Sequence, residues 1–211
     1  MASSLQKCKV QKQEPLASED ARWIRLMKNT YKSADGKTRQ WESAERKTRP
    51  KDSLVDGVGI VAILQKASGP EILLQKQYRA PIDRVSIEVP AGLIDQGETP
   101  EQTAIRELKE ETGFIGEVIK GHLGVTPLMF NDPGFCNTNT FMIHVSVDMS
   151  KPENQSPKPE LEESEFIECF SVPLANLYEE CRRLENEGYA IDARVGTFAE
   201  GIEVAKQFRL T

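Results

Sequence analysis

The sequence contains no apolar run close to the roughly 20 residues that a membrane-spanning helix requires. Its first 15 residues, MASSLQKCKVQKQEP, lack the apolar core of a secretory signal, so we expect neither membrane insertion nor export. The four cysteines (Cys8, Cys136, Cys169 and Cys181) form no CxxC pair. This spacing argues against a zinc site and favours free thiols in a reducing compartment. We therefore expect a cytoplasmic location, with the nucleus as a second location.

Basic residues are scarce over most of the chain. The net charge is −6, yet residues 1–52 carry 13 Lys and Arg against 7 Asp and Glu, whereas residues 53–211 carry 14 against 26. This acidic balance argues against nucleic-acid binding, which depends on neutralising phosphates. The uneven distribution has two interpretations: solvated surfaces, or an acidic body that holds metal beside a basic segment that holds an anionic substrate.

The hydrophobic pattern predicts two parts. Two strand-like runs flank Asp35 and Gly36, a hairpin signal that predicts a small antiparallel sheet within residues 16–50. We expect an N-terminal β-rich segment, 1–52, and a main domain, 53–211. Strands are predicted in the main domain at 58–64, 71–78, 85–89, 118–125, 138–147 and 165–172, and helices at 99–112, 174–188 and 193–208. This mixture of hairpins and helical crossovers predicts an α/β sandwich around a mixed sheet.

The helix predicted at 99–112 is well delimited by its own sequence. Thr99 suits the N-cap, Pro100 the first turn, and Gln102 completes a capping box. Gly113 is a typical residue for the end of a helix.

Three carboxylates, Glu107, Glu110 and Glu111, fall on one side of this helix. Like charges so close together repel one another, and only Arg106 lies near enough within the helix to offset them. A solvated acidic face is one interpretation. The other is a site for a hard cation such as Mg²⁺, which prefers oxygen ligands and shares its coordination with substrate phosphates.

The spacing of the whole segment favours the second interpretation. Gly92 is followed after five residues by Glu98 and, after seven more, by the sequence REUXEEXGU at 106–114, where U is a bulky apolar residue. This pattern, GX5EX7REUXEEXGU, resembles the Nudix box at every defined position, and the chain is identified as a member of the Nudix hydrolase family. The resemblance implies the Nudix fold, an α/β/α sandwich around a mixed sheet.

Further segments are similar to the eukaryotic ADP-sugar pyrophosphatases of this family. They are residues 37–43, 76–81, 88–95, 132–134, 165–168 and 191–195. The resemblance implies Mg²⁺-dependent hydrolysis of the diphosphate of ADP-ribose or a related ADP-sugar to AMP and a sugar phosphate.

The resemblance also implies a divalent-cation site, with Mg²⁺ the expected ion and Mn²⁺ able to replace it. Its ligands would be Glu107, Glu111 and the backbone carbonyl of Ala91, with Glu110 as an additional or outer ligand. Arg106 would orient the glutamates for catalysis.

The general base is expected to be Glu165, by resemblance alone, because Glu162 and Glu163 lie in the same acidic stretch. His122 and His144 fall in strand-like patterns, and we expect both to be structural residues with satisfied hydrogen bonds.

Substrate contacts follow from the same resemblance. Arg46 and Arg79 would bind the phosphates, for which the planar guanidinium is well suited. Glu88 is a further expected substrate contact. Trp23 and Trp41 would stack on adenine, one from each subunit of a homodimer with shared active sites.

Two alternatives remain open from the sequence. One is a Nudix hydrolase of another nucleoside diphosphate derivative; the loop at 125–134 is slightly longer than in the human relative, so the preferred sugar is undetermined. The other is a non-catalytic module that binds ADP-ribose. The presence of Glu98 and of all three helix glutamates favours an enzyme.

Overall fold

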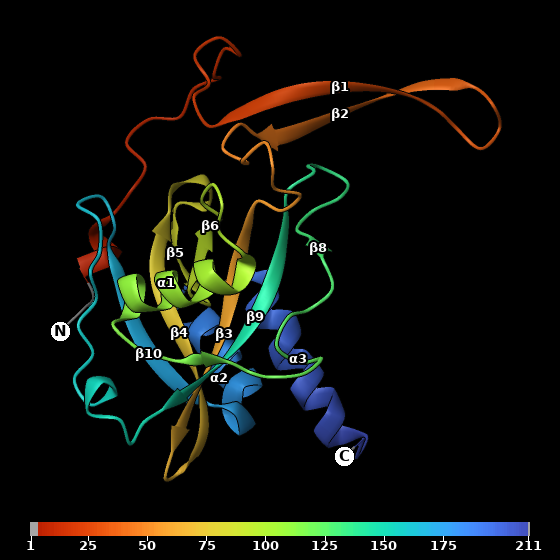
Figure 1. Cartoon of the computed structure of the whole chain (residues 1–211). Coiled ribbons are helices and arrows are strands. Elements are labelled where there is room, and N and C mark those ends of the chain that lie inside the picture. Colours follow the sequence, from red (N-terminus) through yellow and green to blue (C-terminus); the bar gives the residue numbers. More distant parts are fainter. Residues whose placement is uncertain (1–3, 211) are drawn as a thin grey trace.

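A computed structural model describes residues 4–210 as a large mixed sheet with helices on both faces and a separate two-stranded hairpin (Figure 1). The strand order of the large sheet is β11-β5-β4-β3-β9-β7, with β10 paired to β4, β6 to β3 and β8 to β9. The strands are β1 (Ile24–Lys32), β2 (Thr38–Arg46), β3 (Gly57–Lys66), β4 (Gly69–Arg79), β5 (Arg84–Glu88), β6 (Ala91–Leu93), β7 (Glu117–Val118), β8 (Met129–Phe130), β9 (Asn139–Asp148), β10 (Ile167–Pro173) and β11 (Ala190–Ile191). The sheet is mixed because β3 pairs antiparallel with β4 and parallel with β9.

Helix α1 covers one face of the sheet, and α2 and α3 cover the other (Figure 1). Alternation along β3 explains the two layers: Ile60 and Ala62 pack with α1, whereas Val61 and Ile63 pack with α2 and α3. The helices are α1 (Pro100–Thr112), α2 (Leu177–Asn186) and α3 (Ala193–Gln207), with short 3-10 turns η1 (Ser4–Lys7), η2 (Ala80–Ile82), η3 (Pro152–Asn154) and η4 (Leu174–Asn176). The predicted α/β/α sandwich is confirmed.

The predicted N-terminal hairpin is also confirmed, and both strands lie within the predicted range, residues 16–50. Strands β1 and β2 pair over nine positions and form a sheet of their own. The hairpin extends away from the body (Figure 1) and meets it near its base, where the Ala44 N–H donates to the Phe135 carbonyl at 2.9 Å.

Two predictions about strands were wrong. Within the run 118–125, only Val118 belongs to a strand, β7, because the chain turns at Gly121 (φ 89°) and bends at Gly124. His122 therefore lies in an exposed turn. Strand β10 begins at Ile167, so Glu165 lies in the turn before it rather than on the strand.

Within residues 4–210, no helix has the length and apolar character needed to cross a membrane.

Candidate active site

The position of α1 is fixed by the local signals that its sequence contains. The Thr99 side chain accepts a hydrogen bond from the Gln102 backbone N–H, and the Gln102 side chain accepts one from the Thr99 backbone N–H, forming the predicted capping box. At the other end Gly113 adopts a left-handed conformation (φ 74°) that favours glycine. Ala104 and Leu108, both fully buried, hold the helix against the sheet. Glu111 is buried on this same side of α1, whereas Glu107 and Glu110 are partly exposed.

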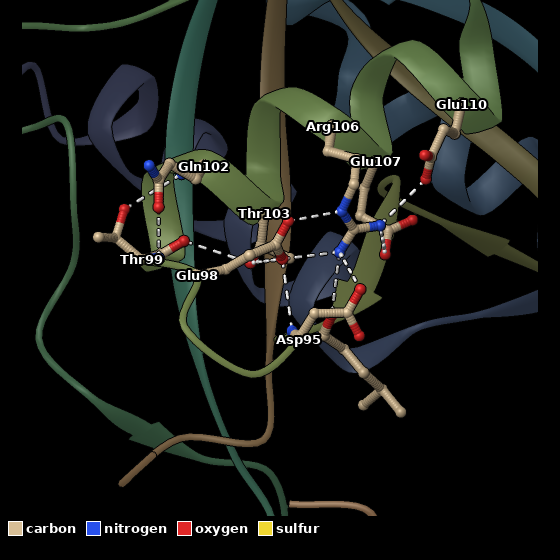
Figure 2. Close-up of polar contacts among 9 residues, drawn as sticks. Asp95, Glu98, Thr99, Gln102, Thr103, Arg106, Glu107 and Glu110 are labelled. Carbon is tan, nitrogen blue, oxygen red and sulfur yellow. Dashed lines mark hydrogen bonds and ion pairs between the residues drawn. The ribbon is translucent and has the colours of Figure 1, made fainter. Parts of the chain in front are cut away.

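Arg106 is the hub of these carboxylates (Figure 2). Its guanidinium donates to Glu98 (Nε–Oε1 2.8 Å, Nη2–Oε2 2.9 Å), and Nη1 donates to Glu107 at 2.8 Å and Glu110 at 3.0 Å. A further bond to the Leu93 carbonyl, at 3.3 Å, connects the helix to β6. The expectation that Arg106 orients the glutamates agrees with this geometry.

The pKa values of Glu98 and Glu107, at the two ends of this cluster, are shifted in opposite directions. The Arg106 guanidinium is the main reason that the pKa of Glu98 falls to about 2, so Glu98 is a permanent anion at neutral pH. Burial raises the pKa of Glu107 and outweighs the opposing effect of Arg106. Glu98 therefore binds the arginine as an anion. The negative charge of Glu107 is made unfavourable by burial, and a further cation would stabilise it.

Glu111 is the most deeply buried of these carboxylates, and burial raises its pKa to about 8. One oxygen accepts a hydrogen bond from the Ala91 N–H at 2.9 Å, and the carboxylate also interacts with the side chain of Gln75. The sequence analysis assigned no role to Gln75, which directly follows the buried apolar residues Ile72–Leu74 of β4.

Gly92 leaves the space that the Glu107 carboxylate occupies. A Cβ atom at position 92 would overlap the Glu107 carboxyl group, whereas at Gly201 in α3 it would meet nothing within 4 Å. The first glycine of the motif is thus required by close packing against a candidate metal ligand.

We expect Gly92→Ala to reduce kcat/KM about 100-fold, because the displaced Glu107 carboxylate cannot keep its position at the site. The fold should survive, since the clash involves the end of a flexible side chain. Steady-state kinetics and the melting temperature should be compared with those of Gly201→Ala. Near-normal kcat/KM in a folded Gly92→Ala protein would contradict this account of the glycine.

The candidate metal ligands fit a divalent cation in their chemistry. Over residues 4–210, no three His, Cys, Asp or Glu side chains already converge as a metal cluster, because Glu107 and Glu110 bind Arg106 instead. The carboxylates are nevertheless hard oxygen donors on adjacent turns of one helix, and the hydrogen bonds that Glu111 receives come from uncharged groups. A buried carboxylate whose partners are all uncharged is stabilised by a nearby cation.

Arg79 lies at the end of β4, within electrostatic range of Glu111. Glu88 holds it in a bidentate ion pair (Nε–Oε1 2.8 Å, Nη2–Oε2 2.7 Å) and is only 3% exposed. Arg194 approaches the same carboxylate at 3.9 Å and pairs with Asp192. Glu88, expected to contact substrate, thus acts in this structure as the support of Arg79. The sequence did not assign roles to Asp192 and Arg194.

Glu165 lies close enough to Glu107 and Glu111 for its charge to raise the pKa of both carboxyl groups. Its own side chain accepts a hydrogen bond from the Glu162 backbone N–H at 3.1 Å. Glu162 and Glu163 are exposed on the same turn. The structure therefore brings the expected base to the side of the site where the helix carboxylates lie.

Within one chain, the hairpin residues that were expected to bind substrate do not reach α1. Trp23 and Trp41 are 62% and 49% exposed, and about six residues of strand, roughly 20 Å, separate them. Trp41 donates to the Gly134 carbonyl at 3.0 Å. Arg46 ends β2 and lines a cavity of about 570 Å³ on the α3 face, together with His144. The expectation that His144 is fully satisfied was wrong, because its Nδ1 is buried without a partner among the described residues.

Comparison with known proteins identifies the class that this fold and site define. The NUDIX domain family matches residues 54–193, and the chain belongs to the Nudix hydrolase family. Nudix hydrolases generally use divalent metal ions.

Individual relatives cover nearly the whole chain. It is 51% identical over 195 residues to the ADP-ribose pyrophosphatase of Saccharomyces cerevisiae, covering 92% of this chain and 82% of the yeast protein. It is 36% identical over 194 residues to the ADP-sugar pyrophosphatase of Mus musculus, covering 91% and 86%. A crystal structure of an ADP compounds hydrolase superposes with a TM-score of 0.57 at 18% identity, covering 92% and 91% of the two chains, which supports the fold.

Proposed function

We propose that the protein hydrolyses the diphosphate of ADP-ribose and related ADP-sugars, releasing AMP and a sugar phosphate. The observation that carries the proposal is the α1 carboxylate cluster. In it Arg106 binds Glu98, Glu107 and Glu110, while Glu111 has no direct ion pair with any residue in the range 4–210. The names of the yeast and mouse relatives, which match over almost the full chain, support the choice of substrate.

Different residues of the chain are assigned to metal binding, proton transfer and phosphate binding. Glu107, Glu111 and the carbonyl of Ala91 would hold Mg²⁺, with Glu110 as an additional ligand and Mn²⁺ as a substitute ion. When bound, the cation supplies positive charge that stabilises the diphosphate and acidifies water.

Proton transfer is assigned to Glu165, which removes a proton from the attacking water as the new P–O bond forms and the bond to the leaving phosphate breaks. Arg79, held by Glu88, stabilises the negative charge that develops on the phosphates.

A substrate panel tests this proposal against its alternatives. ADP-ribose, ADP-glucose, diadenosine polyphosphates and oxidised nucleoside triphosphates should be compared by chromatography of the products. We expect the highest kcat/KM for ADP-ribose or another ADP-sugar. Faster hydrolysis of a different class of nucleotide would mean that this class, and not ADP-sugars, is the substrate. Tight ADP-ribose binding without turnover would indicate a binding module.

We also propose that the chain forms a homodimer in which residues 1–52 serve dimerisation and substrate binding. The hairpin is exposed along all of β1 and along β2 as far as Glu42, with Leu26 70% and Trp41 49% exposed. A two-stranded sheet of this kind has little stability alone, so a covering partner is expected. Its basic character complements the acidic body, which makes a second copy of the chain a suitable partner. Trp23 and Trp41 are then supplied to one adenine by different subunits.

Subunit mixing is expected to restore activity to two defective variants. Glu111→Gln removes a carboxylate of the body, and Trp41→Ala removes stacking by the hairpin, which should lower kcat/KM about 10-fold or more. In a randomly mixed dimer population, one site in four is intact, so activity should return to about a quarter of the wild-type value. Rates should be measured well below KM after mass spectrometry has verified subunit exchange. Exchange without recovery would show that each hairpin serves its own chain.

A further inference from the structure

Gln75 is a polar side chain at the end of the buried run of β4, Ile72–Gln75. The three residues before it, Ile72, Leu73 and Leu74, are at most 2% exposed, and Gln75 itself is 1% exposed. An amide in this position loses its hydrogen bonds to water, so its burial is unfavourable unless the protein supplies partners.

The protein satisfies only one side of this amide. The side chain lies next to the Glu111 carboxyl group and interacts with it, whereas Oε1 is buried without a partner in the described part of the chain. Because Oε1 has no partner, the amide nitrogen is the part of Gln75 that faces this carboxyl group. Gln75 therefore interacts with Glu111 while its own oxygen lacks a hydrogen bond. This cost indicates that Gln75 has a role in the site rather than in packing.

The contacts of Glu111 differ from those of its neighbours. Glu107 and Glu110 are held by the positive charge of Arg106. Glu111 is held instead by two uncharged donors from different strands, the Ala91 N–H on β6 and the Gln75 amide on β4. Uncharged donors fix the direction of a carboxylate and leave its negative charge available to a cation.

We infer that Gln75 is a positioning residue that holds the Glu111 carboxylate in the direction required for divalent-cation binding. The inference rests on the proposed function, in which Glu111 is a metal ligand. It assigns Gln75 no contact with substrate.

The test is Gln75→Met, which keeps the length and approximate shape of the side chain and removes the amide. Titration calorimetry of Mg²⁺ alone into the metal-free, full-length protein should show 10- to 100-fold weaker binding than in the wild type, the usual cost of losing an outer partner of a metal ligand. The melting temperature of the metal-free protein should stay the same or rise, since a buried acceptor without a partner is removed. These opposite changes distinguish positioning from packing.

Gln65→Met is the matched control: it makes the same substitution at an exposed position of β3, and Mg²⁺ binding should be unchanged. Gln75→Glu replaces the donor with a second carboxylate beside Glu111 and should weaken Mg²⁺ binding at least as much as Gln75→Met. Wild-type affinity in Gln75→Met would overturn the inference, as would a lower melting temperature that accompanies the loss of affinity. A wild-type protein that binds no divalent cation would instead refute the proposed function.

Discussion

Glu111→Gln is expected to reduce the turnover of ADP-ribose by at least roughly 1000-fold, equivalent to about 4 kcal/mol of transition-state stabilisation. Glutamine keeps the size of the side chain and removes the negative charge assigned to cation binding. The variant should fold, because burial raises the pKa of Glu111 to about 8, so an uncharged side chain of the same size suits this position. Initial rates and circular dichroism would be measured together.

The dependence of folding stability on pH and Mg²⁺ provides an independent check on Glu111→Gln. Since the pKa of Glu111 is higher in the folded protein than the ordinary value of 4.5, the folded state binds the proton more tightly, and this group lowers stability as the pH rises from about 4.5 to about 8. Metal-free Glu111→Gln should lack that contribution and should not be stabilised by added Mg²⁺ as the wild type is. A folded variant with near-normal turnover would refute the assignment of α1 as the catalytic centre.

Glu165→Gln is expected to lower kcat by about 10²–10⁴-fold with little change in KM, because the residue is assigned to proton transfer rather than binding. Its charge acts on Glu107 and Glu111, which places it beside the proposed metal ligands. Steady-state kinetics with saturating Mg²⁺ would measure the effect.

Glu162→Gln and Glu163→Gln are matched controls, since both side chains are exposed on the same turn. Each should retain nearly full kcat. If one of them is the damaging substitution and Glu165→Gln is silent, the base is a different carboxylate from the one proposed.

Helix α1 could be predicted closely because its limits depend on local interactions. Thr99 and Gln102 cap each other across three residues, and Gly113 ends the helix through its own backbone conformation. The cluster around Arg106 is equally local, since Glu107 and Glu110 lie within one turn of it. Sequence spacing alone therefore places the charged groups correctly.

Contacts between residues far apart in the sequence could not be predicted from such spacing. Gln75 meets Glu111 only because β4 packs beneath α1, and Arg194 reaches Glu88 only because α3 starts beside β5. The error at 118–125 has a different origin: Gly121 and Gly124 interrupt a strand-like pattern, and glycine inside such a run signals a turn.

The most direct test of the central claim is the release of AMP from ADP-ribose by the wild-type protein, with Mg²⁺ and after its removal by a chelator. The account predicts equal amounts of AMP and ribose 5-phosphate with Mg²⁺, no release after chelation, recovery when Mg²⁺ is returned, and no comparable activity in Glu111→Gln. Hydrolysis that continues without a divalent cation, or a folded protein that leaves ADP-ribose and other ADP-sugars intact in the presence of Mg²⁺, would contradict it.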